Sequence, residues 1–490
     1  MRMWAQSHLC QKPQRISSLL AAAFALVFLL LGASQSASAL PAFARKYGLR
    51  CSACHESWPA LNNFGLKFRD NGYQLMNERD SPIWQNPGYW PVTFRITPIW
   101  HRVSSLNQVD TYTPGNPIPT GSTAARISSS GFDMSGLDFH TGGTLEKNFS
   151  FYVLPSSDST GAFHFESVNA RVDNIAGSPW LNIRLGKFEL NNLLSEKRTL
   201  WLTGNGGVYQ TYHFSPVGDG NSFGQMGDNQ LGMEYMGHSV DDKTRVSAAL
   251  LSSNDGSVGL ITGANSYSGF FTFDQGLDAG KLGTERLGAY AFVGEAATYY
   301  LTSGGVPIAG SGIGNKSFSR VGFYGQFYLG PHFDLNVVTQ HGSDNAYFGQ
   351  GYGNAIASDG NGTATCTTST GCPPNNTPGT TLPAGSRAPT WNGYTFEARY
   401  VYSPQLIFKA VFEAERMSQQ ATPGTPSNLG NINNYSIGYR YNPFMTSRAG
   451  LAYFGEFNLF HQDLTGPTNS SGNATNTNTS ELLFGIDFDF

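Results

Sequence analysis

Charged residues are scarce in this chain, because Asp, Glu, Lys and Arg together make up 13% of its 490 residues. A soluble domain usually carries about a quarter charged residues. After Leu40 no apolar run is long enough to cross a bilayer as a helix, which excludes a helical membrane protein. Aromatic residues also reach 13%, and there are 58 glycines. This composition is typical of a transmembrane β-barrel, which has an apolar outer band and a polar interior.

Cysteine is also rare, and a strong positive charge is missing. The net charge is −4, so the composition indicates no nucleic-acid partner. Of the five cysteines, Cys10 falls within residues 1–39, which we expect to be a signal peptide. Basic residues precede an apolar core at Leu19–Leu31, and Ala37–Ala39 forms an A-x-A cleavage site. A retained membrane anchor is the alternative, but the apolar core is short for a membrane span.

Two of the remaining cysteines form a motif with chemistry of its own. Cys51-Ser52-Ala53-Cys54-His55 has the C-x-x-C-H pattern of a c-type haem attachment site. Thiols at this spacing can form thioether bonds to the two vinyl groups of haem, and the adjacent imidazole can ligate the iron. A zinc half-site and a redox dithiol are the alternatives. The motif predicts one covalently bound haem c, with His55 as its proximal axial ligand.

The motif lies in a short segment, residues 40–90, that we expect to be a small helical haem-bearing unit. Pro59 can begin a helix, and Gly72 can end it. Leu61, Phe64 and Phe68 would then share one apolar face, either against a haem or in a small core. The segment is short for an independent domain, so we expect the rest of the protein to support it.

From residue 91 to residue 490 the apolar residues alternate with polar ones, which predicts β-strands. Charged residues occur within these strands, and they would be costly against lipid, so we expect them to face a polar lumen. A soluble sandwich would also alternate. The clearest series of outward-facing residues are Val92, Phe94 and Ile96; Leu181, Ile183 and Leu185; Tyr394, Phe396, Ala398 and Tyr400; and Tyr435, Ile437, Tyr439 and Tyr441.

Turns of two lengths separate the expected strands, and about 16 strands can be counted. Short turns are predicted near Glu146–Asn148, Gly330-Pro331, Ser403-Pro404 and Asn442-Pro443, and long loops at Ser104–Ser130, Glu189–Asn229, Ser343–Thr390 and Ser418–Asn433. Bacterial outer-membrane barrels have short periplasmic turns and long extracellular loops. The sequence therefore predicts an all-β fold, a transmembrane antiparallel barrel preceded by the helical haem segment.

Two long loops carry further candidate features. Cys366 and Cys372 lie in the third loop and are close enough in sequence to form a disulfide, which an exported protein permits. The Glu189–Asn229 loop contains Glu196, Lys197, Arg198 and Trp201, and it could fold inward as a constriction or stay at the surface.

The last strand supports the barrel prediction. Leu482, Phe484, Ile486, Phe488 and Phe490 alternate with smaller or acidic residues, and Phe490 is the final residue. A terminal aromatic residue on an amphipathic last strand looks like the signal that bacterial barrel-assembly machinery recognises.

The beginning of the predicted haem segment resembles a known family, the fused outer-membrane cytochrome–porins, best known as the iron oxidases of iron-oxidising bacteria. The resemblance covers about thirty residues, through Pro41–Gly48, Cys51–His55, Leu61–Gly65 and Gly72-Tyr73. It implies a monohaem cytochrome that plugs or caps a barrel in the bacterial outer membrane, with the haem in the lumen or on its periplasmic side. It also implies an iron:cytochrome c oxidoreductase that passes electrons from extracellular Fe(II), or another donor, to a periplasmic c-type cytochrome or other carrier.

Two questions stay open from the sequence. The distal iron ligand could be Met76, which would raise the haem potential, or His101 or His140 from the first two strands, and a five-coordinate haem is a further alternative. The competing function is a diffusion porin whose haem segment is a plug or a sensor.

Overall fold

The computed structural model describes most of the barrel and part of the N-terminal segment. It describes residues 41–57, 60–77, 80, 82, 91–112, 114–115, 119–157, 161–192, 203, 208–214, 226–227, 229–253, 265–297, 314–345, 388, 390–418, 431–446, 449–463, 467 and 475–490. The predicted signal peptide, the Cys366/Cys372 pair, Pro59 and the charged stretch from Glu196 to Trp201 lie outside the described residues.

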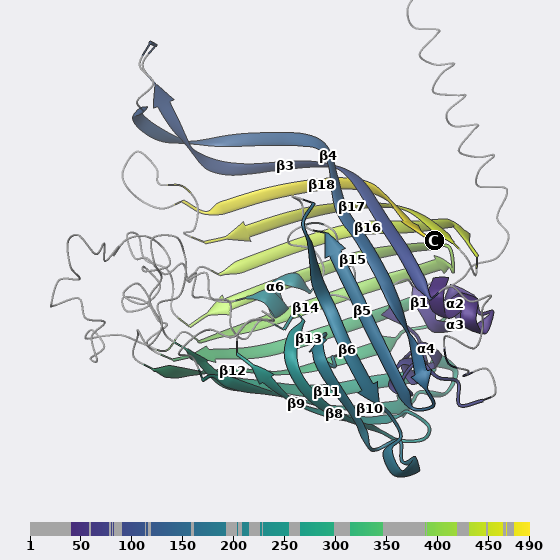
Figure 1. Cartoon of the computed structure of the whole chain (residues 1–490). Coiled ribbons are helices and arrows are strands. Elements are labelled where there is room, and N and C mark those ends of the chain that lie inside the picture. The colour runs from purple at the N-terminus through teal and green to yellow at the C-terminus, as the bar shows by residue number, and fades with distance from the viewer. Residues whose placement is uncertain are drawn as a thin grey trace, which may run out of the picture.

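Sixteen antiparallel strands in the described part of the chain form one closed barrel, which confirms the predicted fold class. Each strand pairs with its neighbours in sequence, and the last strand closes on the first (Figure 1). The strands are β3 (Val92–Tyr112), β4 (Pro119–Glu146), β5 (Phe149–Ser157), β6 (Phe163–Val172), β7 (Asn182–Phe188), β8 (Gln230–His238), β9 (Thr244–Ser252), β10 (Tyr267–Asp278), β11 (Thr284–Ala297), β12 (Asn315–Tyr328), β13 (Phe333–Asp344), β14 (Thr390–Ser403), β15 (Leu406–Met417), β16 (Ile432–Met445), β17 (Gly450–Gln462) and β18 (Thr477–Asp489).

The predicted alternation sorts side chains between lipid and lumen. Outward-facing residues such as Leu185, Phe323 and Ile437 are 53%, 65% and 59% exposed, as expected for the surface of a transmembrane barrel. Inward-facing charged residues such as Arg171 and Glu413 are buried within the barrel. The two-residue period of a strand places these sets on opposite faces, so apolar side chains meet lipid and charges avoid it.

The closure between β18 and β3 explains the pattern of the last strand. The Phe490 amide donates to the Phe94 carbonyl at 3.0 Å, and the Phe94 amide donates back at 2.9 Å. The two rings stack with their centroids 5.3 Å apart. Along β18, Asp487 faces inward and is buried, while Phe484 faces outward. The terminal aromatic residue therefore belongs to the seam that closes the barrel.

One predicted long loop is wrong. Ser104–Ser130 is not a loop, because β3 continues to Tyr112 and β4 already begins at Pro119. Ser104 pairs with Ser128, and the ladder continues to the tip of the hairpin. This β3–β4 hairpin projects beyond the other strands in Figure 1. Its small polar residues lack the alternation that marks lipid-facing strands, which is why the sequence suggested a loop.

One predicted short turn is also wrong, whereas those at Glu146–Asn148, Gly330-Pro331 and Ser403-Pro404 separate strands as expected. Asn442-Pro443 lies inside β16, where the register shifts between Tyr441 and Phe444. Such a bulge accepts proline, because the residue there needs no N–H for the ladder. The turn follows at Thr446, whose amide donates to the Ala449 carbonyl at 2.8 Å.

The N-terminal segment lies at the end of the barrel that carries the short turns (Figure 1). Its elements are α2 (Pro41–Tyr47), α3 (Cys51–Cys54), β1 (His55–Ser57), β2 (Ala60–Leu61) and α4 (Asn63–Asp70). A further helix, α6 (Tyr209–His213), and the 3-10 turns η2 (Ile175–Gly177) and η3 (Gly280–Leu282) follow. In the described part of the chain, no helix is both long and apolar enough to span a membrane.

The predicted helix after the motif exists, but its beginning and its buried face differ. It begins at Asn63, with Asn62 as its N-cap, and Gly72 follows its end with a φ of 73°. Phe68 is buried as expected, whereas Phe64 is 43% exposed. Leu66 takes the buried position instead. Because the helix begins at Asn63, Leu61 lies outside it in β2, and Gly65, Leu66 and Phe68 form its buried face.

Candidate functional site

The C-x-x-C-H motif forms a single helical turn followed by a change of backbone direction. Cys51–Cys54 is helical, and the Ala53 amide donates to the Arg50 carbonyl at 2.9 Å. His55 is the first residue of β1 and pairs with Leu61 of β2. Cys54 and His55 are 8% and 9% exposed. The turn therefore presents Cys54 and His55 to the protein interior rather than to solvent.

Asn62 holds this turn against the beginning of α4. Its amide donates to the Cys54 carbonyl at 2.9 Å, and its side-chain Nδ2 donates to the Ala53 carbonyl at 3.1 Å. The same side chain accepts from the Gly65 amide at 2.9 Å, which is an N-cap. Gly65 has no room for a side chain, because a Cβ there would lie 2.0 Å from the Cys54 carbonyl oxygen. The motif and α4 are thus packed backbone to backbone.

The donor set fits a haem c. It offers two thiols in one C-x-x-C turn and an imidazole at the next position, which is the set required for two thioether bonds and one axial ligand. Burial raises the pKa of the Cys54 thiol to about 11. Thioether formation at Cys54 would remove the buried polar thiol. Cys51 lies at the other end of the turn, and its backbone is helical.

An aromatic cluster encloses the segment beside the motif. Phe43 of α2 stacks on Tyr73 with ring centroids 4.9 Å apart, and Phe68 of α4 meets Phe43 edge-on at 5.5 Å. The Tyr47 hydroxyl lies within hydrogen-bond distance of two acceptors, the Tyr73 carbonyl at 2.9 Å and the Asp80 carboxylate at 2.8 Å. Edge-on and stacked pairs at these distances are favourable beyond their buried area. These contacts join α2, α4 and the chain after α4 into one unit.

This unit is fixed to the barrel wall along α2. The Ala42 amide donates to Thr93 Oγ1 at 3.0 Å, and Lys46 Nζ donates to Thr144 Oγ1 at 2.8 Å. Burial lowers the pKa of Lys46 to about 8, against the opposing effect of Asp80. Helix α2 therefore lies against β3 and β4, the first two strands of the barrel.

Arginines of the wall hold the other end of the unit, the C-terminus of α4. Arg171 donates to the Arg69 and Asp70 carbonyls at 2.8 and 3.1 Å and pairs with Asp173 at 2.6 Å. These two carbonyls are among the groups that a helix C-terminus leaves without an intrahelical partner. Arg245 lies 2.8 Å from the Asp70 carboxylate.

Asp70 and its neighbours form a buried ion-pair network. Burial by itself would raise the pKa of Asp70, but the Arg245 and Arg69 guanidiniums outweigh it and hold that pKa well below its usual range. Arg245 also pairs with Asp242 at 2.6 Å, and Arg286 pairs with Asp274 at 2.9 Å. In this network each buried charge between α4 and the wall has a partner of opposite charge, which compensates for the loss of water.

The three candidates for a distal ligand each have a protein partner of their own. Met76 is 50% exposed, and its Sδ lies 4.0 Å from Asn174 Nδ2. His101 lies within β3 rather than at its end, 3.9 Å from Asp133. His140 Nδ1 lies 2.8 Å from the Tyr152 hydroxyl, and its buried Nε2 lies 3.9 Å from Asp138.

The connection between β7 and β8 enters the barrel, so the inward alternative holds for its described residues. The side chains of Thr211 in α6 and Thr395 in β14 lie 2.6 Å apart, and Gln340 of β13 donates to the Thr211 carbonyl at 3.0 Å. The Thr203 amide donates to Glu456 at 2.9 Å. Helix α6 and Thr203 are therefore held by lumen-facing groups of the wall.

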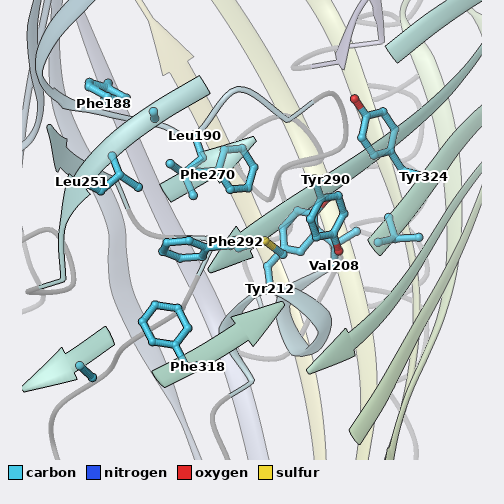
Figure 2. Close-up of a cluster of buried hydrophobic side chains, with 14 of the residues drawn as sticks. Phe188, Leu190, Val208, Tyr212, Leu251, Phe270, Tyr290, Phe292, Phe318 and Tyr324 are labelled. Carbon is cyan, nitrogen blue, oxygen red and sulfur yellow. The ribbon is translucent and has the colours of Figure 1, made fainter. Parts of the chain in front are cut away.

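A buried apolar cluster fills part of the lumen around this connection (Figure 2). Its members come from α4, from the end of β7, from the inward connection and from the inner face of β9–β13; they are Leu66, Phe188, Leu190, Val208, Tyr212, Met226, Ala249, Leu251, Phe270, Tyr290, Phe292, Ala296, Phe318, Tyr324 and Val338. The sequence analysis missed this cluster. One sequence pattern could have predicted it: β10 has aromatic residues on both faces, Phe270 inward and Phe271 outward. An aromatic residue on the lumen face indicates that other side chains cover that face.

Comparisons with known proteins find similarity to solved structures alone. No protein-family model and no curated protein matches the chain. Solved structures that are similar include an anion-selective porin from Comamonas acidovorans, with 11% identity and a TM-score of 0.47 over 81% of this chain and 98% of that one. OprB of Pseudomonas putida has 11% identity and a TM-score of 0.44 over 81% and 94% of the two chains. A loop-deletion mutant of OmpT from Vibrio cholerae has 10% identity and a TM-score of 0.43 over 81% and 99%. No function is transferred from these barrels to this chain.

Proposed function

We propose that the protein is an electron-transfer barrel of the bacterial outer membrane that carries one haem c at its periplasmic end. The observation that carries the proposal is the C-x-x-C-H turn, whose Cys54 and His55 are buried and which packs against α4 at the short-turn end of a closed barrel. Short turns face the periplasm in outer-membrane barrels, and haem c is attached after export.

The residues of the N-terminal segment would act as follows. Cys51 and Cys54 bond the haem, His55 is its proximal ligand, and Asn62 and Gly65 hold that turn in place. The bound haem supplies one-electron redox chemistry. The buried arginines Arg171 and Arg245 hold the C-terminus of α4 against the barrel wall. As the distal ligand we propose Met76, with His101 and His140 as alternatives.

The proposed route of the electron crosses the membrane between the two ends of the barrel. We propose an extracellular donor, Fe(II) in the first instance, and a periplasmic c-type cytochrome or other carrier as the acceptor, which would make the protein an iron:cytochrome c oxidoreductase. The resemblance of Pro41–Tyr73 to the fused cytochrome–porins supports this choice of partners. The lipid of the outer membrane would surround the apolar outer band of the barrel.

A diffusion porin with a haem-bearing plug is the second candidate. Its supporting observation is the closed barrel with buried charges such as Arg399 and Glu397 on its inner face, as in water-filled channels. The apolar cluster speaks against a wide channel, because it occupies the lumen beside β9–β13 with side chains rather than with water.

One experiment separates the two candidates. Fe(II) is added to outer-membrane vesicles, and haem reduction is followed by absorbance, while solute flux is measured on the reconstituted barrel. Electron transfer predicts rapid haem reduction and little flux. A haem that stays oxidised in a barrel that passes small solutes freely would establish the porin instead.

A matched pair of variants tests the attachment site itself. The double change Cys51→Ala and Cys54→Ala should abolish covalent haem and leave a folded barrel in the outer membrane. Ser52→Ala, within the same turn, should retain the haem. Covalent haem in the double variant would disprove the attachment site.

A further inference from the structure

The inner face of the barrel carries a row of aromatic side chains where a channel would carry polar ones. Phe318 and Tyr324 of β12, Phe292 and Tyr290 of β11, and Phe270 of β10 all point inward and are at most 4% exposed. Figure 2 shows these rings one after another across the neighbouring strands. Together with Trp391 of β14, which is 1% exposed, we call them the aromatic ladder.

From Phe318 to Tyr324, consecutive rings of the aromatic ladder are in contact. The centroids of Phe318 and Phe292 are 5.3 Å apart, and those of Phe292 and Phe270 are 5.8 Å apart. Tyr290 follows at 6.3 Å from Phe270, and Tyr324 at 6.3 Å from Tyr290. All four distances lie within the range of interacting aromatic pairs. From Phe318 to Tyr324 the row spans six residues of β12, which is about 20 Å along the strand.

The end of the aromatic ladder at Trp391 and Phe318 lies where the long connections begin. Arg320 lies between Phe318 and Trp391, with its guanidinium 5.5 and 4.3 Å from the two rings. Asp344, the last residue of β13, pairs with Arg320 at 2.8 Å and fixes it there. Trp391 is the second residue of β14, after the long connection from β13. This end of the barrel faces the outside of the cell if the short turns face the periplasm.

The other end of the aromatic ladder, at Tyr324, reaches α4, the helix that packs against the C-x-x-C-H turn. The Tyr324 hydroxyl donates to Asp274 at 3.3 Å, and Asp274 pairs with Arg286 at 2.9 Å. Arg286 donates to Asn63, the first residue of α4, at 3.4 Å. Leu66 of α4 belongs to the same buried cluster as the ladder, and the neighbouring Gly65 is packed on Cys54. A continuous series of packed or hydrogen-bonded groups therefore connects Trp391, near the long connections, with α4 and the C-x-x-C-H turn.

We infer that the aromatic ladder is the route by which electrons cross the barrel between an external one-electron donor and the haem attachment site. Electron tunnelling falls off steeply with distance, and it falls off less steeply through packed atoms than through gaps or water. A seal needs only apolar volume, which Leu, Ile or Val would provide. The rings in contact from Phe318 to Tyr324, joined to Trp391 through the Arg320 guanidinium, provide packed atoms along the whole route in addition.

This inference rests on the proposed function and deepens it. For each electron, the donor is oxidised by one unit, as from Fe(II) to Fe(III), and haem iron is reduced from Fe(III) to Fe(II). The periplasmic carrier accepts the electron afterwards. The ladder residues return unchanged, so no further oxidant or proton acceptor is required.

The test replaces one ring in the row and one ring beside it. Phe292→Leu removes a ring that contacts both Phe318 and Phe270, while most of the apolar volume stays. Phe188→Leu is the matched control, because Phe188 is equally buried in the same cluster but packs on Arg184 of its own strand. Haem reduction is followed by stopped-flow absorbance in outer-membrane vesicles, with Fe(II) as the donor outside. Haem content and midpoint potential are measured in parallel.

We expect Phe292→Leu to slow reduction by about tenfold, and Phe188→Leu to leave it within about twofold. Haem content and potential should match wild type in both variants. Equal rates in Phe292→Leu and wild type would overturn the ladder and leave the proposed function standing. Equal slowing in both variants would also overturn it, because packing in general would then be the cause. A wild-type haem that Fe(II) does not reduce would overturn the proposed function and the ladder together.

Discussion

Arg245 joins α4 to the barrel wall through a buried ion pair with Asp70. Its side chain is 4% exposed and lies 2.8 Å from Asp70 of α4, 2.6 Å from Asp242 and 3.9 Å from Asp274. Replacing it by methionine keeps much of its volume and removes its charge. Arg245→Met would leave the Asp70 carboxylate buried with Arg69 as its remaining close cation.

The expected loss of unfolding free energy follows from the charges that remain buried in Arg245→Met. The network contains three carboxylates, on Asp70, Asp242 and Asp274, and three guanidiniums, on Arg69, Arg245 and Arg286. Removing one partner of a buried pair costs about 3–5 kcal/mol. Arg286 stays 2.9 Å from Asp274 and 3.8 Å from Asp242, so it compensates in part. We therefore expect a loss near the lower limit, about 3 kcal/mol.

The assay is urea-induced unfolding of the refolded barrel in detergent micelles, followed by fluorescence. Lys243→Met is the matched control, because Lys243 pairs with Asp278 at 2.6 Å but the two side chains are 35% and 65% exposed. An exposed pair contributes at most about 1 kcal/mol. If Arg245→Met loses no more stability than Lys243→Met, the network does not anchor α4.

Four further predictions concern the attachment segment. Leu66→Ala should destabilise the barrel by about 2–5 kcal/mol in the same urea assay, because Leu66 is 1% exposed in the lumen cluster. Asn62→Ala should remove the N-cap of α4, at about 1 kcal/mol, and lower the yield of covalent haem measured by in-gel haem staining. In haem-free protein, iodoacetamide should alkylate Cys54 slowly at pH 8 and faster as the pH approaches about 11, since burial raises the pKa of this thiol; rapid alkylation at pH 8 would contradict its burial. The pKa of Asp70 is lowered in the folded protein, so its contribution to stability is present above its unfolded pKa of about 3.9 and is lost as the pH falls below that value. Asp70→Asn should therefore be less stable than wild type at pH 7, and the difference should shrink below about pH 4.

The amino-acid sequence by itself determined the class of fold. Alternation such as Val92–Thr97 depends on the two-residue period of a single strand, so it can be recognised without knowledge of the partner strand. The same holds for the C-x-x-C-H motif, whose chemistry needs residues within one turn. The final strand, ending at Phe490, was predicted correctly for this reason as well.

The tertiary structure decided what lies inside the barrel and how its ends are built. Arg171 and Arg245 are far from α4 in the sequence, and their role appears when β6 and β9 bring them to the carbonyls and carboxylate at its end. The turn near Pro443 moved to Thr446, because pairing with β17 continues past a bulge. Phe270 and Phe292 look like ordinary strand residues until the closed barrel and α6 cover their inner face. Contacts between distant segments carry no local period, so sequence patterns could predict the wall of this barrel but not its contents.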